Sequence, residues 1–94
     1  MLGSRVTTYL RLIGANVQRW RVRRGLTQDE FSEAVGLDVR FLRRVERGSV
    51  NLRFDTIVRL ALALGVEPGA LLRRVKVVEP KPGRPRARRI RTTR

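Results

Sequence analysis

Arginines recur at helical spacing in the middle of the chain, at positions 40, 43, 44 and 47. In an α-helix, residues three and four apart are neighbours on the surface, so these side chains would form one stripe. Like charges placed so close repel one another and weaken an isolated helix. Guanidinium groups donate hydrogen bonds to phosphates and to the edges of bases. The stripe therefore indicates a surface that binds a polyanion.

Composition excludes most other chemistry. The chain has no cysteine and no histidine, which rules out disulfides, thiolate chemistry, imidazole bases and zinc fingers. The acidic residues Asp29, Glu30 and Glu33 fit a solvated helix face with a cap better than a catalytic cluster. We therefore expect no enzyme and no bound metal or cofactor. The longest apolar run, Ile57–Val66, is broken by Arg59 and is too short to span a membrane, and no signal-peptide pattern opens the chain.

Positive charge is concentrated at the C-terminal end. The 94 residues carry a formal net charge of +14, of which residues 73–94 contribute +9 from 10 basic residues and 1 acidic residue. This segment is rich in proline and has almost no large apolar residue after Val78, so it cannot offset an ordering entropy of about 1–2 kcal/mol per residue. We interpret residues 73–94 as a disordered basic tail whose partner is a nucleic acid. The alternative is a tail that only improves solubility.

Apolar periodicity predicts an all-α fold of five short helices. The first helix stops before Gly25, and Gly14 within it weakens the expectation of one continuous helix. Its apolar face comprises Val6, Leu10, Ile13, Val17 and Trp20. The last helix, Val66–Leu72, has Pro68 in its first turn.

The three helices in between are marked by capping residues at their starts and glycines at their ends. The capping residues are Asp38, Asn51 and Thr27, which pairs with Glu30 in a capping box. The residues expected to face inward are Phe31, Ala34 and Val35 in the first of these helices, Leu42 and Val45 in the second, and Phe54, Ile57, Val58, Ala61 and Leu64 in the third. A helix of two turns, a tight turn at Gly36 and a second helix opening at Asp38 have the spacing of a helix-turn-helix.

Sequence segments in register across all five expected helices carry a family resemblance. They are Leu12-Ile13-Gly14 with Val17, Trp20 and Arg21; Gly25-Leu26-Thr27-Gln28 to Gly36-Leu37; Leu42 with Arg44-Val45-Glu46-Arg47-Gly48; and Leu60–Val66 to Leu71-Leu72. With these segments the chain resembles the phage repressor/Cro (Xre) type of helix-turn-helix protein, which includes restriction-modification controllers and antitoxins. The resemblance implies a repressor-like DNA-binding domain over residues 12–72, after an N-terminal helical extension over residues 1–11. It also implies that the third helix, residues 39–47, enters the major groove of operator DNA and that the protein is a symmetric dimer.

The resemblance also implies roles for individual residues. The positions that read bases in the family are occupied by Val39, Arg40 and Arg44, with Arg43 beside them. The positions that contact phosphate are occupied by Gln28, which also braces the third helix, by Arg47, and by the loop that contains Ser49, Asn51 and Arg53. Arg21 and Glu46 match a salt bridge that ties the first helix to the end of the third.

Physical chemistry adds detail to these roles. Arg40 and Arg44 are four residues apart, about 6 Å along a helix axis, so they could address neighbouring guanines through bidentate hydrogen bonds. Val39 suits the methyl group of a thymine. Three residues depart from the family pattern: Phe41 is bulky where a small residue is usual, Leu52 replaces a common proline, and Arg43 replaces a frequent serine or other polar residue. We expect Phe41 to pack inward rather than to stand at the DNA surface.

Within the tail, Gly83-Arg84-Pro85 resembles the core of an AT-hook. Glycine would permit close approach to the DNA, proline would stiffen the extended chain, and Arg84 would enter the narrow minor groove with its strong negative potential. The alternative for this segment is nonspecific phosphate binding.

Together these observations predict a cytoplasmic, nucleoid-associated transcription regulator of the repressor or controller type, which binds double-stranded DNA sequence-specifically as a homodimer. Two sets of apolar residues could supply the dimer contact: Val66, Leu71, Leu72 and Val75, or Val6 and Tyr9. One alternative is an antitoxin-type regulator that binds a toxin as well as DNA. Another is an RNA-binding or ribosome-associated basic protein, although the scarcity of aromatic residues argues against stacking on single strands. A third is a protein-interaction adaptor with a degenerate helix-turn-helix.

Overall fold

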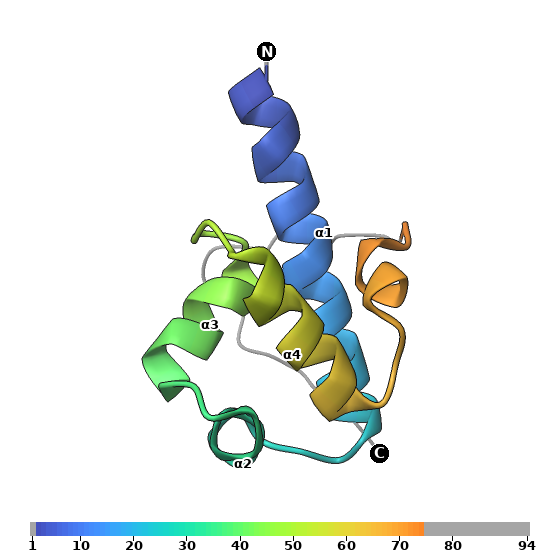
Figure 1. Cartoon of the computed structure of the whole chain (residues 1–94). Helices are drawn as coiled ribbons and strands as arrows, with labels where there is room; N and C mark the ends of the chain where they lie inside the picture. The colour runs from blue at the N-terminus through green and yellow to red at the C-terminus, as the bar shows by residue number, and fades with distance from the viewer. Residues whose placement is uncertain (1, 75–94) are drawn as a thin grey trace, which may run out of the picture.

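The computed structural model describes residues 2–74, and all regular secondary structure within them is helical, which confirms the all-α class. The elements are α1 (Leu2–Arg23), α2 (Gln28–Val35), α3 (Val39–Arg47), α4 (Phe54–Leu64) and the 3₁₀-helix η1 (Pro68–Leu72). Figure 1 shows α1 as the long central element, with α4 and η1 to one side of the pair formed by α2 and α3. No helix between residues 2 and 74 combines the length and the apolar character that crossing a lipid bilayer demands.

Helix α1 runs through Gly14 without a break, although a glycine in this position suggested one. The glycine serves close packing instead. A Cβ atom at position 14 would lie 2.7 Å from the carbonyl oxygen of Glu46, at the C-terminal end of α3. The N-terminal turns of α1 extend past the rest of the bundle (Figure 1), and Val6 in these turns is 43% exposed. The predicted apolar face of α1 is therefore buried only in its C-terminal half, at Ile13 and Val17.

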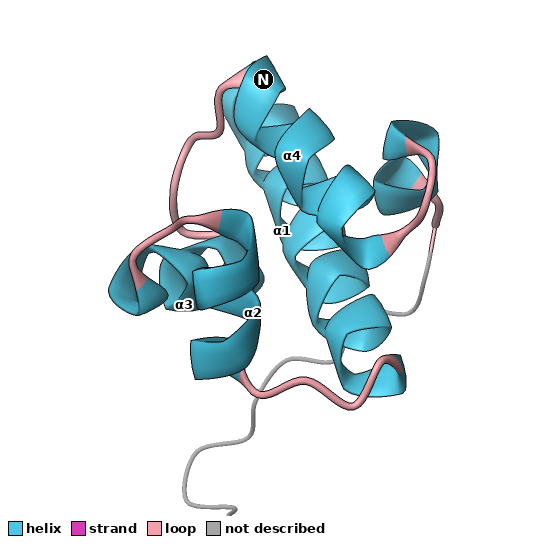
Figure 2. Ribbon diagram, turned by 60° about the horizontal axis from the view of Figure 1, so that its bottom comes forward, coloured by secondary structure: helices cyan, strands magenta, loops and turns pink. Residues whose placement is uncertain are grey.

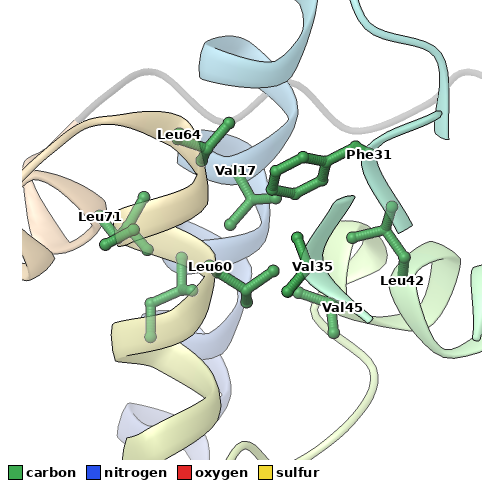
Figure 3. Close-up of a cluster of buried hydrophobic side chains, with 10 residues drawn as sticks. Val17, Phe31, Val35, Leu42, Val45, Leu60, Leu64 and Leu71 are labelled. Atoms are coloured by element: carbon green, nitrogen blue, oxygen red, sulfur yellow. The ribbon is translucent and has the colours of Figure 1, made fainter. Parts of the chain in front are cut away.

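One hydrophobic core joins the helices (Figure 3). Phe31 of α2, Leu42 of α3 and Leu60 of α4 are fully buried around Val17 of α1. Helix α3 packs against α1 and α2, while η1 packs against α1 and α4 and inserts Leu71 into the core. In Figure 2, α2 and α3 lie together on one side, and α1 and α4 lie beside each other. The outer surface of α3 is left open by this arrangement.

Local signals set the boundaries of α2 and α3 as predicted. The hydroxyl of Thr27 accepts a hydrogen bond from the backbone N–H of Glu30, and the Glu30 carboxylate accepts one from the backbone N–H of Thr27, which completes the capping box. Asp38 caps α3 by accepting from the backbone N–H of Arg40 at 2.7 Å. Gly36 and Gly48 end α2 and α3 with left-handed φ angles of 82° and 72°, which favour glycine.

The predicted start and inner face of α4 were partly wrong. Asn51 does not cap the helix: Arg53 occupies the cap position without a side-chain hydrogen bond, and the helix begins at Phe54. Val50 and Leu52 pack partly against the core, which keeps the preceding loop extended. Leu60, Ala61 and Leu64 face the core, with Ile57 and Val58 partly buried. Phe54 is 76% exposed. It lies six residues before the buried Leu60, so its side chain points about 120° away from that of Leu60 around the helix. In α2, Ala34 is exposed rather than inward-facing.

The predicted fifth α-helix is a short 3₁₀-helix. Pro68 opens it as expected, but it has only five residues and is held by the hydrogen bond from the Ala70 N–H to the Glu67 carbonyl. The Asn16 side chain on α1 donates to the carbonyls of Leu71 and Arg73, both at 2.8 Å, and so fixes the end of this turn.

The burial of Leu71 also corrects one dimer expectation. Leu71 is fully buried in the core of the chain itself and is not available to a partner, whereas Leu72 is 47% exposed. The other predicted contact at Val75 and the AT-hook-like segment with Arg84 lie outside the described residues.

Candidate nucleic-acid interface

Helix α3 presents its arginines to solvent. Leu42 and Val45 on its inner side are 0% and 1% exposed, whereas the outer side carries exposed Arg40, Arg43, Arg44 and Arg47. With Asp38 and Phe41 these arginines line one shallow, open depression. Val39, at the leading end of the helix, is half-buried. The separation of the two sides follows from the 3.6-residue period, because Leu42 and Val45 are three residues apart on the inner side and the arginines recur three or four residues apart on the outer side.

A mostly buried ion pair anchors the C-terminal half of α3. The Arg21 Nε atom lies 2.6 Å from Oε2 of Glu46, and the two side chains are only 10% and 4% exposed. Arg21 donates further to the other carboxylate oxygen at 3.1 Å and to the carbonyl of Leu26 at 2.8 Å. Arg21 thus ties α3 both to α1 and to the loop before α2.

Gln28 extends this network to the surface of α3. Its Nε2 donates to Oε1 of Glu46 at 3.0 Å, and its Oε1 accepts from Nε of Arg43 at 3.3 Å. The side chain therefore bridges the buried ion pair and one of the exposed arginines. A charged carboxylate that accepts hydrogen bonds from several well-placed donors is strongly held. The hydrogen bonds to Glu46 therefore help packing to determine the orientation of α3 relative to α2.

Asp38 and Arg40 form a second, exposed pair at the start of α3. The Nε and one terminal nitrogen of Arg40 donate to the two carboxylate oxygens of Asp38, both at 3.2 Å. These hydrogen bonds, together with the one from the Arg40 backbone N–H, hold the pKa of the Asp38 carboxyl below its ordinary value. The same pairing raises the pKa of Arg40. The sequence predicted only that Asp38 caps α3. An acidic residue two positions before an arginine was the feature of the sequence that could have predicted the ion pair.

Phe41 meets the inward expectation only in part. It packs partly against the core, and it also lines the depression beside the arginines. The guanidinium carbon of Arg44 lies 5.8 Å from the centre of the Phe41 ring, within the range of a cation–π contact. The Phe41 side chain therefore contacts both the Arg44 guanidinium and the core.

The loop after α3 contributes further polar groups. The hydroxyl of Ser49 donates to the carbonyl of Arg44 at 3.2 Å. Asn51 is exposed. Arg53 pairs with Asp55 through a fork of hydrogen bonds at 3.1 and 3.3 Å. The loop follows directly on α3, and Ser49, Asn51 and Arg53 are all exposed to solvent.

The fold and this surface define a helix-turn-helix protein, with α2 as the supporting helix and α3 as the exposed one. The chain belongs to the HTH_3 helix-turn-helix family, whose model matches residues 17–71. The resemblance to repressor/Cro-type regulators is thereby confirmed, and the chain is a DNA-binding transcription regulator.

Relatives in three bacteria share this domain. The uncharacterized HTH-type transcriptional regulator y4dJ of Sinorhizobium fredii is 41% identical over 56 residues, which are 60% of this chain and 73% of that protein. A hypothetical transcription factor of Neisseria meningitidis is 34% identical over 61 residues, which are 65% of this chain and 58% of the relative. The crystal structure of the restriction-modification controller protein C.AhdI from Aeromonas hydrophila has a TM-score of 0.63 at 35% identity, over 66% of this chain and 94% of that one.

Proposed function

We propose that this regulator recognises a specific double-stranded DNA sequence as a homodimer, with α3 in the major groove. The observation that carries the proposal is the row of exposed arginines on α3, on a helix whose inner side is held by the Arg21–Glu46 pair. A rigidly held helix with outward donors fits the width of the major groove, where base edges can be distinguished. Neither the antitoxin nor the RNA-binding alternative is favoured by the relatives.

Different residues of this surface are expected to recognise bases and to contact phosphates. We assign base contacts to Val39, Arg40 and Arg44, with Arg43 beside them. Since Arg40 and Arg44 are separated by about 6 Å along the axis, each would address a different guanine, next to a thymine methyl packed on Val39. We assign phosphate contacts to Gln28, Arg47, Ser49, Asn51 and Arg53.

A selection of bound duplexes from a random pool tests these assignments. Arg40→Ala and Arg44→Ala should each relax the preference at one base position per half-site, since a bidentate arginine–guanine contact gives about 1–3 kcal/mol of discrimination. Arg5→Ala is the control, because it removes the same charge from an exposed position on α1. If either α3 variant selects the same sequences as the wild type, that residue does not read a base.

Homodimer formation would place two α3 helices about 34 Å apart, one turn of DNA. It is supported by exposed apolar side chains on α4 and η1: Phe54 is 76%, Leu62 67% and Leu72 47% exposed. Phe54 and Leu62 are eight residues apart on the same side of α4, with the partly buried Val58 between them. Leu62→Glu should yield monomers in sedimentation velocity, whereas Val22→Glu, at an exposed position on α1, should leave the dimer intact. A dimer in both variants would exclude this surface.

The basic tail is proposed to add affinity without adding much base discrimination. Tethering raises the local concentration of its positive charges near DNA. Deleting residues 79–94, which include Arg84, should weaken binding and flatten the dependence of log K on log salt, because fewer counterions are released. An unchanged slope would contradict a DNA role for the tail. We further propose that the protein acts in the cytoplasm at the nucleoid and has no catalytic activity.

A further inference from the structure

Asp38 is an acidic group at one end of the arginine row on α3. We infer that Asp38 is a positioning residue that determines which edge of the Arg40 guanidinium faces the DNA, and that it thereby increases base discrimination while lowering affinity for random duplexes. This inference rests on the proposed function, since it concerns how one of the assigned base contacts is made. It goes beyond the capping role that the sequence indicated.

The carboxylate is anchored to the helix backbone before it contacts the arginine. Its Oδ1 accepts from the backbone N–H of Arg40 at 2.7 Å, as the cap of α3. The same carboxylate accepts from the Arg40 Nε and from one terminal nitrogen, both at 3.2 Å. Because the cap restrains the carboxylate, the carboxylate in turn restrains the guanidinium. Arg40 is thus held relative to the axis of α3 although its side chain is 81% exposed.

The fork leaves a defined set of donors available. A guanidinium has five N–H groups in one plane. Asp38 engages the Nε–H and one N–H of the neighbouring terminal nitrogen, so the adjacent edge, which is formed by one N–H from each terminal nitrogen, remains open. Two parallel N–H groups on that edge match the O6 and N7 acceptors of guanine. Held in this way, Arg40 is oriented for a bidentate contact before it meets the base, and less side-chain entropy is lost on binding.

The negative charge also acts on phosphates. An unpaired exposed arginine can swing to the nearest phosphate of any duplex, which adds affinity without sequence preference. Asp38 compensates the charge of Arg40 and repels phosphates at this end of the helix. The pair therefore contributes little to nonspecific binding, and Arg40 contributes mainly where a guanine is present.

The chain offers a matched comparison at the start of α4. Arg53 and Asp55 are also two residues apart and form the same fork, with distances of 3.1 and 3.3 Å and exposed fractions of 84% and 61%. Asp55→Asn therefore removes the same charge from the same type of pair, but away from α3. Any effect that depends only on net charge should be equal in the two variants.

Asp38→Asn tests the inference, because asparagine caps helices as well as aspartate but loses the charge. The measurement is the Kd for a duplex substituted at the base whose preference Arg40→Ala relaxes, divided by the Kd for the preferred duplex. We expect Asp38→Asn to lower this ratio by about threefold to tenfold, within the discrimination that a bidentate contact provides. Its affinity for random duplexes should equal or exceed that of the wild type, and far-UV circular dichroism should show that the variant is folded.

Two controls separate positioning from a general charge effect. Asp55→Asn should keep the wild-type ratio at this base. In an Arg40→Ala background, Asp38→Asn should leave the ratio unaltered, because the group that it positions is missing. A wild-type ratio in Asp38→Asn, or an equal loss in Asp55→Asn or in the Arg40→Ala background, would overturn the inference alone. A wild-type protein that prefers no duplex over any other would overturn the proposed function itself.

Discussion

The contact between α1 and the end of α3 at Gly14 offers a sharp test of how the exposed helix is held. A Cβ atom at this position would lie 2.7 Å from the carbonyl oxygen of Glu46, 2.9 Å from its carbonyl carbon, and closer still to the carbonyl oxygen of Val45. All three are backbone atoms, which cannot rotate away as a flexible side chain can. Gly14→Ala therefore forces the two helices apart.

The magnitude follows from two opposing effects. Alanine is favoured over glycine inside a helix by about 1 kcal/mol. Overpacking in a close-packed core costs about 1–3 kcal/mol, and the backbone contact at Gly14 places this case at the upper end. We expect Gly14→Ala to lower the free energy of unfolding by about 1–2 kcal/mol, which for a domain of this size lowers the melting temperature by roughly 5–15 °C.

Urea denaturation followed by far-UV circular dichroism and by Trp20 fluorescence measures this change. Gly3→Ala is the matched control, because it lies in the same helix and a Cβ atom there would meet nothing within 4 Å. It should be neutral or stabilise the protein by up to about 1 kcal/mol. If Gly14→Ala is as stable as Gly3→Ala, the close approach of α1 to α3 does not limit this position and the packing argument fails.

Three further perturbations probe other contacts. Glu46→Gln leaves the mostly buried Arg21 without its counter-charge and should lower the free energy of unfolding by about 3 kcal/mol in urea. Asn16→Ala removes two hydrogen bonds to the η1 segment; it should cost about 1–3 kcal/mol and accelerate hydrogen exchange in η1. In an NMR titration, Asp38 should have a pKa below its ordinary value because of Arg40. The stability from that pair is then fully present at neutral pH and is lost as pH falls through the lowered pKa.

Each of these expectations has a control and a contradicting result. Glu33→Gln and Gln18→Ala alter exposed positions and should leave stability near that of the wild type. If Glu46→Gln and Glu33→Gln are equally stable, the ion pair does not hold α3. Unchanged exchange in the η1 segment of Asn16→Ala would mean that packing alone orders that turn. An Asp38 carboxyl that titrates at or above its ordinary pKa would exclude the fork with Arg40 in solution.

Features that act within a few residues were predictable from the sequence. The capping box at Thr27 and the cap at Asp38 depend only on a side chain and a backbone N–H two or three positions later. The outward direction of the arginine row on α3 follows from the apolar period that buries Leu42 and Val45. The partnership of Arg21 and Glu46 came from the family resemblance, since nothing in their spacing along the chain brings them together.

Features that depend on tertiary contacts were not predictable in the same way. Asn51 is a good capping residue, but packing of Val50 and Leu52 against the core keeps the loop extended and delays α4 to Phe54. The turn at η1 depends on a side chain more than 50 residues away, Asn16. The fork at Arg40 and the bond from Arg43 to Gln28 depend on rotamers, which residue spacing does not specify.

The left-handed glycine at the end of α3 restricts how this regulator could acquire new targets. Gly48 has a φ of 72°, and a Cβ atom there would lie 2.7 Å from the backbone of Arg11. The cap at Asp38 marks the other end, so an inserted or deleted residue between them would rotate the outward side chains on one side of the change by about 100° relative to those on the other. Altered preferences should therefore arise by exchange of side chains at constant helix length, and combinatorial libraries for engineered variants should randomise α3 without changing its residue count.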